Sequence, residues 1–356
     1  MAEHVAVTSK GGGGDEAAEL MARAMALHAK YPLFDGHNDL PWALHDGFAH
    51  ITDPALGGPD LRQELKGQTY DKIRHRCLHT DIPRLRRGGA GAQFWSVYIP
   101  TTVVGDAAVQ KTLEQIDCVH KLCERYPEAF EFAWTAADVL RIHAAGKVAS
   151  VCGLEGGHHI NNSLATLRMY HRLGCRYMTL THNGGPGWAK PAVDSAGRWV
   201  LGGVARCAPD SPSAAGAPPL TRFGAAVVRE MERIGMIVDL SHVHQETMRA
   251  VLALARSPVM FSHSSSQALC AHPRDVPDDV LEVRGAPPSP SPTSPRLRRR
   301  CRRCRRRLVP RPALWRTLQS PSPPLLSITV GARSFHHTSE RRTFLVGSRA
   351  TDRPTD

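Results

Sequence analysis

Apolar runs of strand length alternate along the chain with amphipathic stretches of helical spacing. Segment 224–242, GAAVVREMERIGMIVDLSH, shows the unit: apolar positions at helical spacing, a glycine stop, then a continuous apolar run. Strands are expected near 32–36, 92–99, 148–153, 176–181, 235–240 and 257–262, and helices near 16–29, 108–125, 136–146, 163–173, 222–234 and 245–255. Such alternation is typical of an α/β fold with a parallel sheet and outer helices, either a barrel or doubly wound. No dinucleotide fingerprint or phosphate loop follows these runs, which disfavours a nucleotide-binding protein.

Composition divides the chain into three parts. Residues 1–14 are polar and glycine-rich and are expected to be disordered, whereas residues 15–283 hold the strand–helix alternation. Residues 284–356 form a low-complexity tail rich in Arg and Pro, for which disorder is also expected. A proline-rich insertion at 206–219 is expected to be a surface loop. The lone CRRC motif at 301–304 has no second Cys or His pair at the spacing of a zinc finger.

The net charge of +12 resides in the tail. From residue 284 onward there are seventeen Arg, no Lys and three acids, a balance of +14, which leaves −2 for residues 1–283. The charge of residues 1–283 therefore does not indicate a polyanion partner for the expected domain. The Arg-rich tail could bind nucleic acid through phosphate contacts. Seventeen Arg without Lys would also result from GC-rich codons read in an altered frame or from an intron.

Targeting signals and membrane segments are not evident in the sequence. The N-terminus has no basic stretch followed by an apolar one, and the C-terminus has no apolar tail typical of a lipid-anchor signal. No run approaches the roughly eighteen apolar residues that a membrane span needs. We therefore expect a cytoplasmic protein in which most of the nine cysteines are thiols.

Five side chains suited to metal binding stand where expected strands give way to loops. They are His37 and Asp39 in LFDGHNDLP, Glu155 in ASVCGLEGGHH, His242 in GMIVDLSHVH and His263 in SPVMFSHSS. Catalytic residues of parallel barrels come from the carboxyl ends of several strands. Histidine nitrogens and carboxylate oxygens are the usual protein ligands of a hydrolytic zinc site. A bimetal hydrolase is therefore the leading hypothesis.

The spacing of these residues fits ions that share ligands. Because side chains alternate along a strand, His37 and Asp39 point to the same face and can bind one ion together. Glu155 offers two oxygens that can bridge two ions, and His242 and His263 can complete the ligand set of the second ion. Two ions about 3.5–4 Å apart can hold a hydroxide and polarise a carbonyl group.

Longer segments around these residues resemble the renal (membrane) dipeptidase family of zinc metallopeptidases. The resemblance runs from about Tyr31 to Leu281 through LFDGHNDLPW, HTDIPRLRRGGAGAQFWSVYIP, GLEGGHHI, RYMTLTHN, IVDLSHV and FSHSSSQALCAHPRDVPDDVL. Members of this family are (β/α)8 barrels of the TIM type that cleave dipeptides with two zinc ions. The resemblance therefore implies this fold, a Zn2+ pair as cofactor and dipeptides as substrates. It also allows a homodimer.

The resemblance implies a role for each metal-binding residue. His37 and Asp39 correspond to ligands of the first zinc ion, Glu155 to the bridging ligand, and His242 and His263 to ligands of the second. A hydroxide held between the two ions would attack the peptide carbonyl.

Two further residues correspond to substrate contacts in the family. His182, in YMTLTHNGG, is another strand-end histidine, which its position alone leaves as either structural or substrate-facing. The resemblance implies that His182 contacts the substrate and stabilises the tetrahedral intermediate. Arg274, in HPRDVPDD, would by itself be read as a solvated loop charge. The resemblance implies that its planar guanidinium group pairs with the free carboxylate of the substrate.

The chain departs from the family pattern near Val283, where the resemblance stops. About six of the eight barrel strands are therefore expected, with two unpaired edges, before the basic tail. The acidic residue that shuttles protons late in the family domain has no counterpart, since the only later acids are Glu340, Asp352 and Asp356. No catalytic acid–base residue is assigned, and impaired turnover is expected because such a group contributes about 10²–10⁴-fold in rate.

The sequence also allows other functions. The chain could be an inactive zinc-binding homologue, or another metal-dependent amidohydrolase on the same barrel. A third alternative, from a different class, is a nucleic-acid binder that acts through the Arg-rich tail. Family members are commonly secreted and membrane-anchored, whereas this sequence shows neither signal.

Overall fold

A computed structural model describes residues 13–48, 54–65, 67, 69–71, 76–194 and 218–282. The N-terminal residues 1–12, most of the expected surface loop at 206–219 and the basic tail at 284–356 lie outside the described residues. Expectations for these segments, including the CRRC motif, stay predictions.

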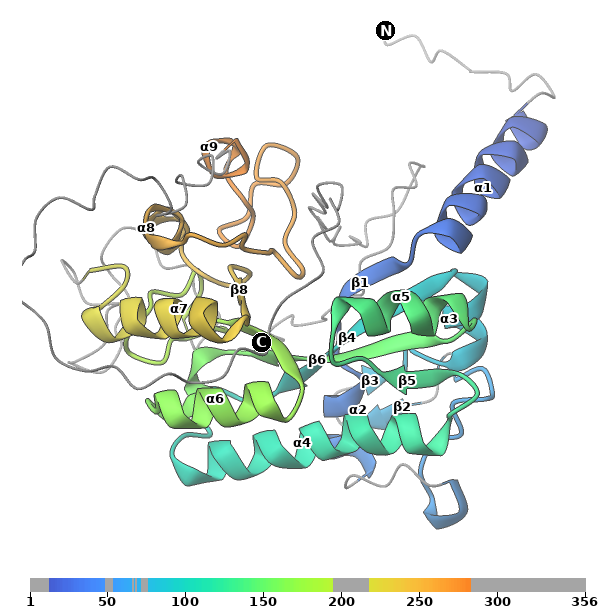
Figure 1. Cartoon of the computed structure of the whole chain (residues 1–356), viewed down its shortest axis with the longest axis horizontal. Helices are drawn as coiled ribbons and strands as arrows, with labels where there is room; N and C mark the ends of the chain where they lie inside the picture. Colours follow the sequence, from blue (N-terminus) through green and yellow to red (C-terminus); the bar gives the residue numbers. More distant parts are fainter. Residues whose placement is uncertain are drawn as a thin grey trace, which may run out of the picture.

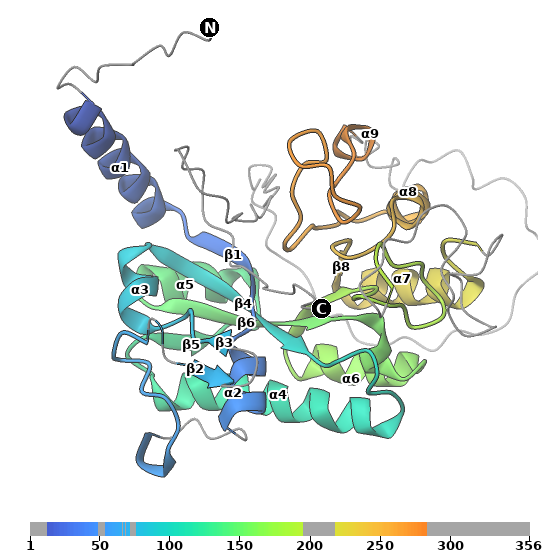
Figure 2. The same ribbon diagram turned by 180° about the vertical axis from the view of Figure 1, so that it is seen from behind.

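One parallel sheet organises the described residues (Figures 1 and 2). Its strands are paired in the order β1, β4, β6, β7 and β8, which is their order along the chain. A parallel bridge between Asp239 and Met260 continues the sheet beyond β8. The bounds are β1 Leu33–Asn38, β4 Ala90–Tyr98, β6 Val148–Glu155, β7 Cys175–Thr179 and β8 Ile237–Asp239. Because the order never reverses, the sheet is of the barrel kind rather than doubly wound.

Three short strands were not expected from the sequence. Strand β5, Phe130–Phe132, pairs in parallel with the first residues of β6. Strands β2, Thr69–Asp71, and β3, Arg76–Cys77, form a separate antiparallel pair. These runs are too short for periodicity to distinguish them from loops.

Helices follow the strands as the alternation predicts. The six expected helices are present as α1 Gly13–Lys30, α4 Asp106–Arg125, α5 Ala136–Ala144, α6 Leu164–Arg172, α7 Arg222–Ile234 and α8 Gln245–Leu254. Further helical elements are α2 Leu40–Phe48, η1 Pro54–Leu56, α3 Ile82–Arg87, η2 Gly157–Ile160 and α9 Asp278–Leu281. Figure 1 shows α1 extending away from the rest of the fold. None of the helices in the described ranges is long and apolar enough to cross a membrane.

Local sequence signals explain where several helices begin and end. Thr135 and Asp138 form a reciprocal capping box at the start of α5. Thr221 caps α7 by accepting a hydrogen bond from the backbone of Gly224, and Gly235 ends the helix in the left-handed conformation. The turn at Gly235 then leads directly into β8, whose Asp239 lies beside the candidate site.

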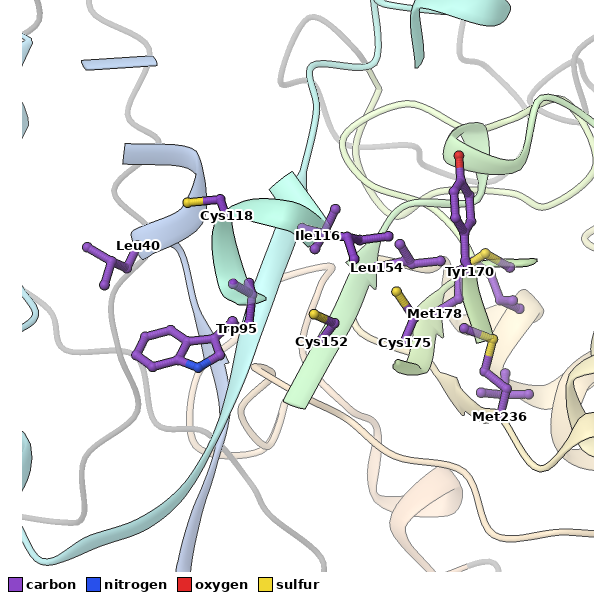
Figure 3. Close-up of a cluster of buried hydrophobic side chains, with 14 of the residues drawn as sticks. Leu40, Trp95, Ile116, Cys118, Cys152, Leu154, Tyr170, Cys175, Met178 and Met236 are labelled. Carbon is purple, nitrogen blue, oxygen red and sulfur yellow. The ribbon is translucent and has the colours of Figure 1, made fainter. Parts of the chain in front are cut away.

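Alternate residues of β4 and β6 belong to two different apolar clusters. Trp95 and Leu154 belong to the larger cluster, which joins the sheet to helices including α4 and α6 (Figure 3). Phe94 and Val151 belong to the smaller cluster on the opposite, inner face. Because side chains alternate with period two, Glu155 continues the inner face at the end of β6.

Two glycines allow close approaches on this inner face. A Cβ atom at Gly153 would lie 2.1 Å from Cζ of Tyr177, so only glycine leaves room for that ring. A Cβ atom at Gly36 would lie 2.4 Å from the carbonyl oxygen of Ser262. Strand β1 therefore lies directly against the segment after Met260, which brings the first and last ligand-bearing segments together.

Candidate metal centre

The predicted ligands converge at one end of the sheet. His37 lies in β1, Glu155 is the last residue of β6, and His182 follows β7. His242 follows β8, and His263 follows the bridge at Met260. The carboxyl ends of parallel strands meet at one edge, so residues far apart in sequence become neighbours.

Glu155 occupies the middle of this cluster. Its Oε1 lies 3.0 Å from Nε2 of His242, 3.3 Å from Nε2 of His263 and 3.5 Å from Nε2 of His182. Its Oε2 lies 3.5 Å from Nε2 of His37 and accepts a 3.0 Å hydrogen bond from the Ser96 hydroxyl. The two oxygens of one carboxylate thus face imidazoles from four different segments.

The ligand atoms form two compact groups that share Glu155. One contains His37, Glu155 and His263, and the other contains Glu155, His182 and His242; within each group the ligand atoms lie within 4.8 Å of one another. Asp39 belongs to neither group but lies beside the first, with its Oδ1 3.1 Å from Nε2 of His37. His242 and His263, which the resemblance assigns to one ion, fall in different groups, although their Nε2 atoms lie 2.9 Å apart.

The imidazoles also approach one another closely. Nε2 of His242 lies 2.9 Å from Nε2 of His263, and the rings of His37 and His263 have centroids 3.8 Å apart. His182 and His242 follow with a centroid separation of 4.2 Å. Four imidazoles therefore share one small buried volume around Glu155.

Burial and mutual interaction change the acidity of these groups. Burial, reinforced by Asp39, raises the pKa of Glu155 to about 8. Burial alone would lower the pKa of His37, but the Glu155 and Asp39 carboxylates outweigh it and raise that pKa to about 9. Burial, then the positive charge of Arg274, holds the pKa of His182 and of His242 well below its ordinary value.

Arg274 reaches into the cluster from the segment after His263. Its side chain is buried, and one terminal nitrogen lies 2.6 Å from Nε2 of His242. The sequence alone favoured a solvated loop charge at this position. Because Arg274 is buried beside the histidines, it is not a solvated loop charge. Its guanidinium group is a permanent positive charge at the site.

Backbone geometry fixes His242 in an unusual conformation. Its φ is +66°, in the left-handed region that non-glycine residues rarely adopt. The carbonyl oxygen of His242 accepts a 2.8 Å hydrogen bond from the amide of Ala192, which helps to hold this turn. Strained residues of this kind cluster at functional sites.

The residues present fit a divalent metal ion. His182 and His242 are held neutral by burial and by Arg274, and a neutral imidazole is the form that binds metal. A nearby cation would offset the burial of the Glu155 carboxylate. The donor set of histidine nitrogens and carboxylate oxygens is the one that hydrolytic zinc sites use.

Several polar neighbours of the centre were not predicted. Tyr177 and Asn183 lie beside imidazole nitrogens of His37 and His242, and Ser262 lies beside His263. Asp239 accepts a hydrogen bond from Ser262. Asp239 stands three residues before His242, and Ser262 stands directly before His263. A polar residue next to a strand-end histidine is therefore the sequence feature that could have predicted these neighbours.

A barrel-type parallel sheet with histidines and a shared carboxylate at its strand ends is an arrangement suited to binding metal ions. Residues 21–285 match the membrane dipeptidase family, peptidase family M19, and the chain belongs to this family. The resemblance inferred from the sequence motifs is thereby confirmed.

A curated relative supports the assignment. The dipeptidase verJ of Clonostachys rogersoniana is 37% identical over 273 residues, which cover 74% of this chain and 62% of that protein. The chain thus spans less than two thirds of the length of this relative.

Solved structures share the fold. The probable dipeptidase PvdM from Pseudomonas aeruginosa aligns with a TM-score of 0.56 at 20% identity, over 74% of this chain and 60% of that one. A metallopeptidase from Rhodobacter sphaeroides, liganded with a phosphinate mimic of the dipeptide L-Ala-D-Ala, gives 0.52 at 24% identity, with 70% of each chain covered. At these identities the likeness establishes a common fold and confirms the expected barrel class.

Proposed function

We propose that this chain is a dizinc metallodipeptidase that hydrolyses the peptide bond of dipeptides. The observation that carries the proposal is the position of Glu155, whose two oxygens lie between four imidazoles at the strand ends. Family membership supports the class of reaction. The metal identity, the number of ions and the activity of this chain are part of the proposal.

The proposed ligands divide between two ions that share Glu155. His37 and Asp39 would hold the first, and His242 and His263 the second. When bound, zinc would supply a Lewis acid for the peptide carbonyl and lower the pKa of water. The deep burial of Glu155 and the histidines would exclude bulk water, which strengthens electrostatic interactions at the reacting bond.

His182 and Arg274 are proposed to bind the substrate. A neutral His182 imidazole can donate a hydrogen bond to the oxygen that becomes negative as water adds to the carbonyl. Arg274 has the guanidinium group that pairs with a free carboxylate through two hydrogen bonds. Selection of a carboxylate next to the scissile bond would restrict hydrolysis to very short peptides.

The substrate class has independent support. A structure with the same fold was solved with a phosphinate mimic of a dipeptide. A phosphinate resembles the tetrahedral species formed by water attack on a peptide bond, and tight binding of such mimics is expected of a hydrolase. The substrate proposed for this chain is therefore a dipeptide, with no particular pair of residues specified.

The proposal is tested by zinc content and hydrolysis measured on the same folded protein. We expect about two zinc ions per chain by elemental analysis, turnover of a simple dipeptide, and loss of turnover with a chelator. Glu155→Gln should lower both the zinc content and the rate. His143→Gln, whose imidazole lies outside the cluster and beside the Ala29 carbonyl, is the matched control and should change neither.

The outcomes separate the alternatives. Zinc bound without turnover would favour an inactive homologue, and hydrolysis of cyclic amides but not dipeptides would favour another amidohydrolase. If the folded protein binds no zinc, the proposal is wrong. Nucleic-acid binding by the basic tail, a homodimer and a cytoplasmic location stay predictions.

A further inference from the structure

Asp239, at the end of β8, is fully buried and accepts four hydrogen bonds. Its Oδ1 accepts from the backbone amides of Ser241 at 3.1 Å and Ser262 at 2.9 Å. Its Oδ2 accepts from the hydroxyls of Thr179 at 2.5 Å and Ser262 at 2.7 Å. An ionised carboxylate has about four acceptor positions, so these donors saturate it. Asp239 therefore ties together the three segments that lead to His182, His242 and His263.

The Ser262 hydroxyl connects Asp239 to His263. Its oxygen lies 2.7 Å from Oδ2 of Asp239 and also 2.7 Å from Nδ1 of His263. A hydroxyl has one proton to donate. The buried Asp239 carboxylate is a stronger acceptor than the neutral His263 imidazole. If the serine proton pointed away from Asp239, a lone pair of the serine oxygen would face the carboxylate oxygen and repel it. The proton therefore points to Asp239.

The orientation of Ser262 decides the tautomer of His263. With its proton donated to Asp239, the serine oxygen can only accept, so Nδ1 of His263 must carry the proton and donate it. The opposite nitrogen, Nε2, then carries no proton and can serve as a ligand atom. That atom lies 3.3 Å from Oε1 of Glu155 and 2.9 Å from Nε2 of His242.

His242 reaches the same tautomer by independent contacts. A guanidinium group can only donate, so Nε2 of His242 accepts from Arg274 at 2.6 Å. Its proton is therefore on Nδ1, which faces Oδ1 of Asn183 at 3.3 Å. The unprotonated Nε2 atoms of His242 and His263 thus converge beside Glu155, an arrangement that a cation stabilises.

We propose that Asp239 is a positioning residue, which acts through Ser262 to keep the His263 proton on Nδ1 and the Nε2 lone pair directed at the metal centre. This inference rests on the proposed zinc site and extends it to a residue outside the ligand set. Groups that orient a metal-binding histidine commonly change metal affinity by about 10–100-fold when they are altered.

The test compares zinc affinity among three variants of the full chain by competition with a chromophoric chelator. Asp239→Asn keeps the shape, but its amide would donate to Ser262, turn the hydroxyl toward His263 and move the imidazole proton to Nε2. We expect zinc to bind about 10–100-fold more weakly. Ser262→Ala removes the relay while keeping Asp239, and zinc should also bind more weakly.

Thr179→Val is the matched control. It removes another hydroxyl donor from the same Asp239 oxygen without touching His263. A purely structural role of Asp239 predicts that Thr179→Val and Ser262→Ala weaken zinc binding alike. The positioning role predicts unchanged zinc affinity for Thr179→Val, even where urea unfolding shows a loss of stability.

A second readout follows the proton directly. In metal-free protein, 15N NMR of labelled histidine should show His263 protonated at Nδ1, with its signal identified by its loss in His263→Gln. Ser262→Ala should remove the preference for a proton on Nδ1. This variant therefore tests the proposal even if Asp239→Asn does not fold. A proton on Nε2 of His263 in the parent protein would overturn the proposal.

The two proposals fail in different ways. If the parent protein binds no zinc, the proposed function is wrong. If the parent binds zinc and both Asp239→Asn and Ser262→Ala bind it equally well, only the positioning role is wrong.

Discussion

Arg274 places a permanent positive charge 2.6 Å from the His242 imidazole, in a part of the fold from which water is largely excluded. In the proposed dipeptidase this charge meets the substrate carboxylate. Replacement by Ala should raise KM for a dipeptide about 10–100-fold, because hydrogen bonds to charged groups contribute about 1.5–3 kcal/mol. Steady-state kinetics on a dipeptide and on its C-terminal amide would measure this, and the amide should be insensitive to the change.

A surface arginine provides the control for Arg274. Arg249→Ala removes an exposed ion pair with Asp279 and should leave KM unchanged, because exposed pairs contribute little. An unchanged KM for Arg274→Ala would count against substrate selection by its carboxylate.

His158 gives a prediction that does not depend on metal. Its Nε2 lies 3.0 Å from the Ile99 carbonyl, and burial lowers its pKa to about 4 from the ordinary 6.5. The unfolded chain therefore binds a proton that the folded protein excludes between these values. The free energy of unfolding should fall as the pH drops from 6.5 to 4, by up to about 1.4 kcal/mol per pH unit from this group.

The His158→Gln variant isolates that contribution. A Gln amide can still donate to the Ile99 carbonyl but does not titrate, so stability should fall less steeply with acid. Urea unfolding at several pH values between 4 and 7 would measure the slope. An equal slope in both proteins would show that His158 is not the titrating group.

At the residue scale, the sequence predicted the side chains that form the cluster but not those that orient them. Each predicted ligand has a metal-binding side chain and lies at the end of a strand, and both properties are visible in its own short segment of sequence. These ligands are His37, Glu155, His242 and His263. Asp239 acts on His263 through Ser262, which lies in another segment. Such contacts across strands depend on register, which local pattern does not contain.

At the scale of elements, Gly36 sets how closely β1 lies against the segment after Met260. Gly36→Ala should destabilise the fold by about 1–3 kcal/mol, because its Cβ would meet the Ser262 backbone and overpacking strains the core. The shift should also separate His37 from His263 and weaken zinc binding. Urea unfolding and zinc titration would measure the two effects.

Gly88 supplies the comparison for Gly36. It follows α3 with φ −77°, and an added Cβ would lie 3.3 Å from the nearest backbone oxygen. Gly88→Ala should therefore cost less stability and leave zinc binding unchanged. Equal effects of the two substitutions would contradict the role of the close approach at Gly36.

The elements with clear start and stop signals in their own segment were predictable, and those without such signals were not. Helix α7 has a clear apolar face, a threonine cap and a terminal glycine, and all three signals lie within its own segment. Helix α2 has nine residues, as do α5 and α6, but those two begin at Thr135 and Ser163 caps, whereas α2 has a proline at its second position. Strand β5 has three residues, as does β8, but β8 closely follows the glycine that ends α7. The conformation of α2 and β5 depends on packing against neighbouring elements, which the periodicity of their own segments does not indicate.

At the scale of the whole molecule, zinc should stabilise the fold because its ligands come together only in the folded sheet. Free zinc at 100 times its dissociation constant should raise the free energy of unfolding by about 2.7 kcal/mol. Chemical unfolding with zinc and with a chelator would measure the difference. Glu155→Gln should show a smaller difference, and an equal one in both proteins would place the stabilising ion elsewhere.

The convergence of Glu155 with imidazoles from four segments has a practical consequence for preparations of the protein. A molecule in which any one of these segments is misplaced lacks a complete ligand set, however much helix it contains. Zinc bound per chain would then report the fraction of molecules with a correctly assembled sheet. A purified sample could be assayed for conformational homogeneity by metal titration before any substrate is added.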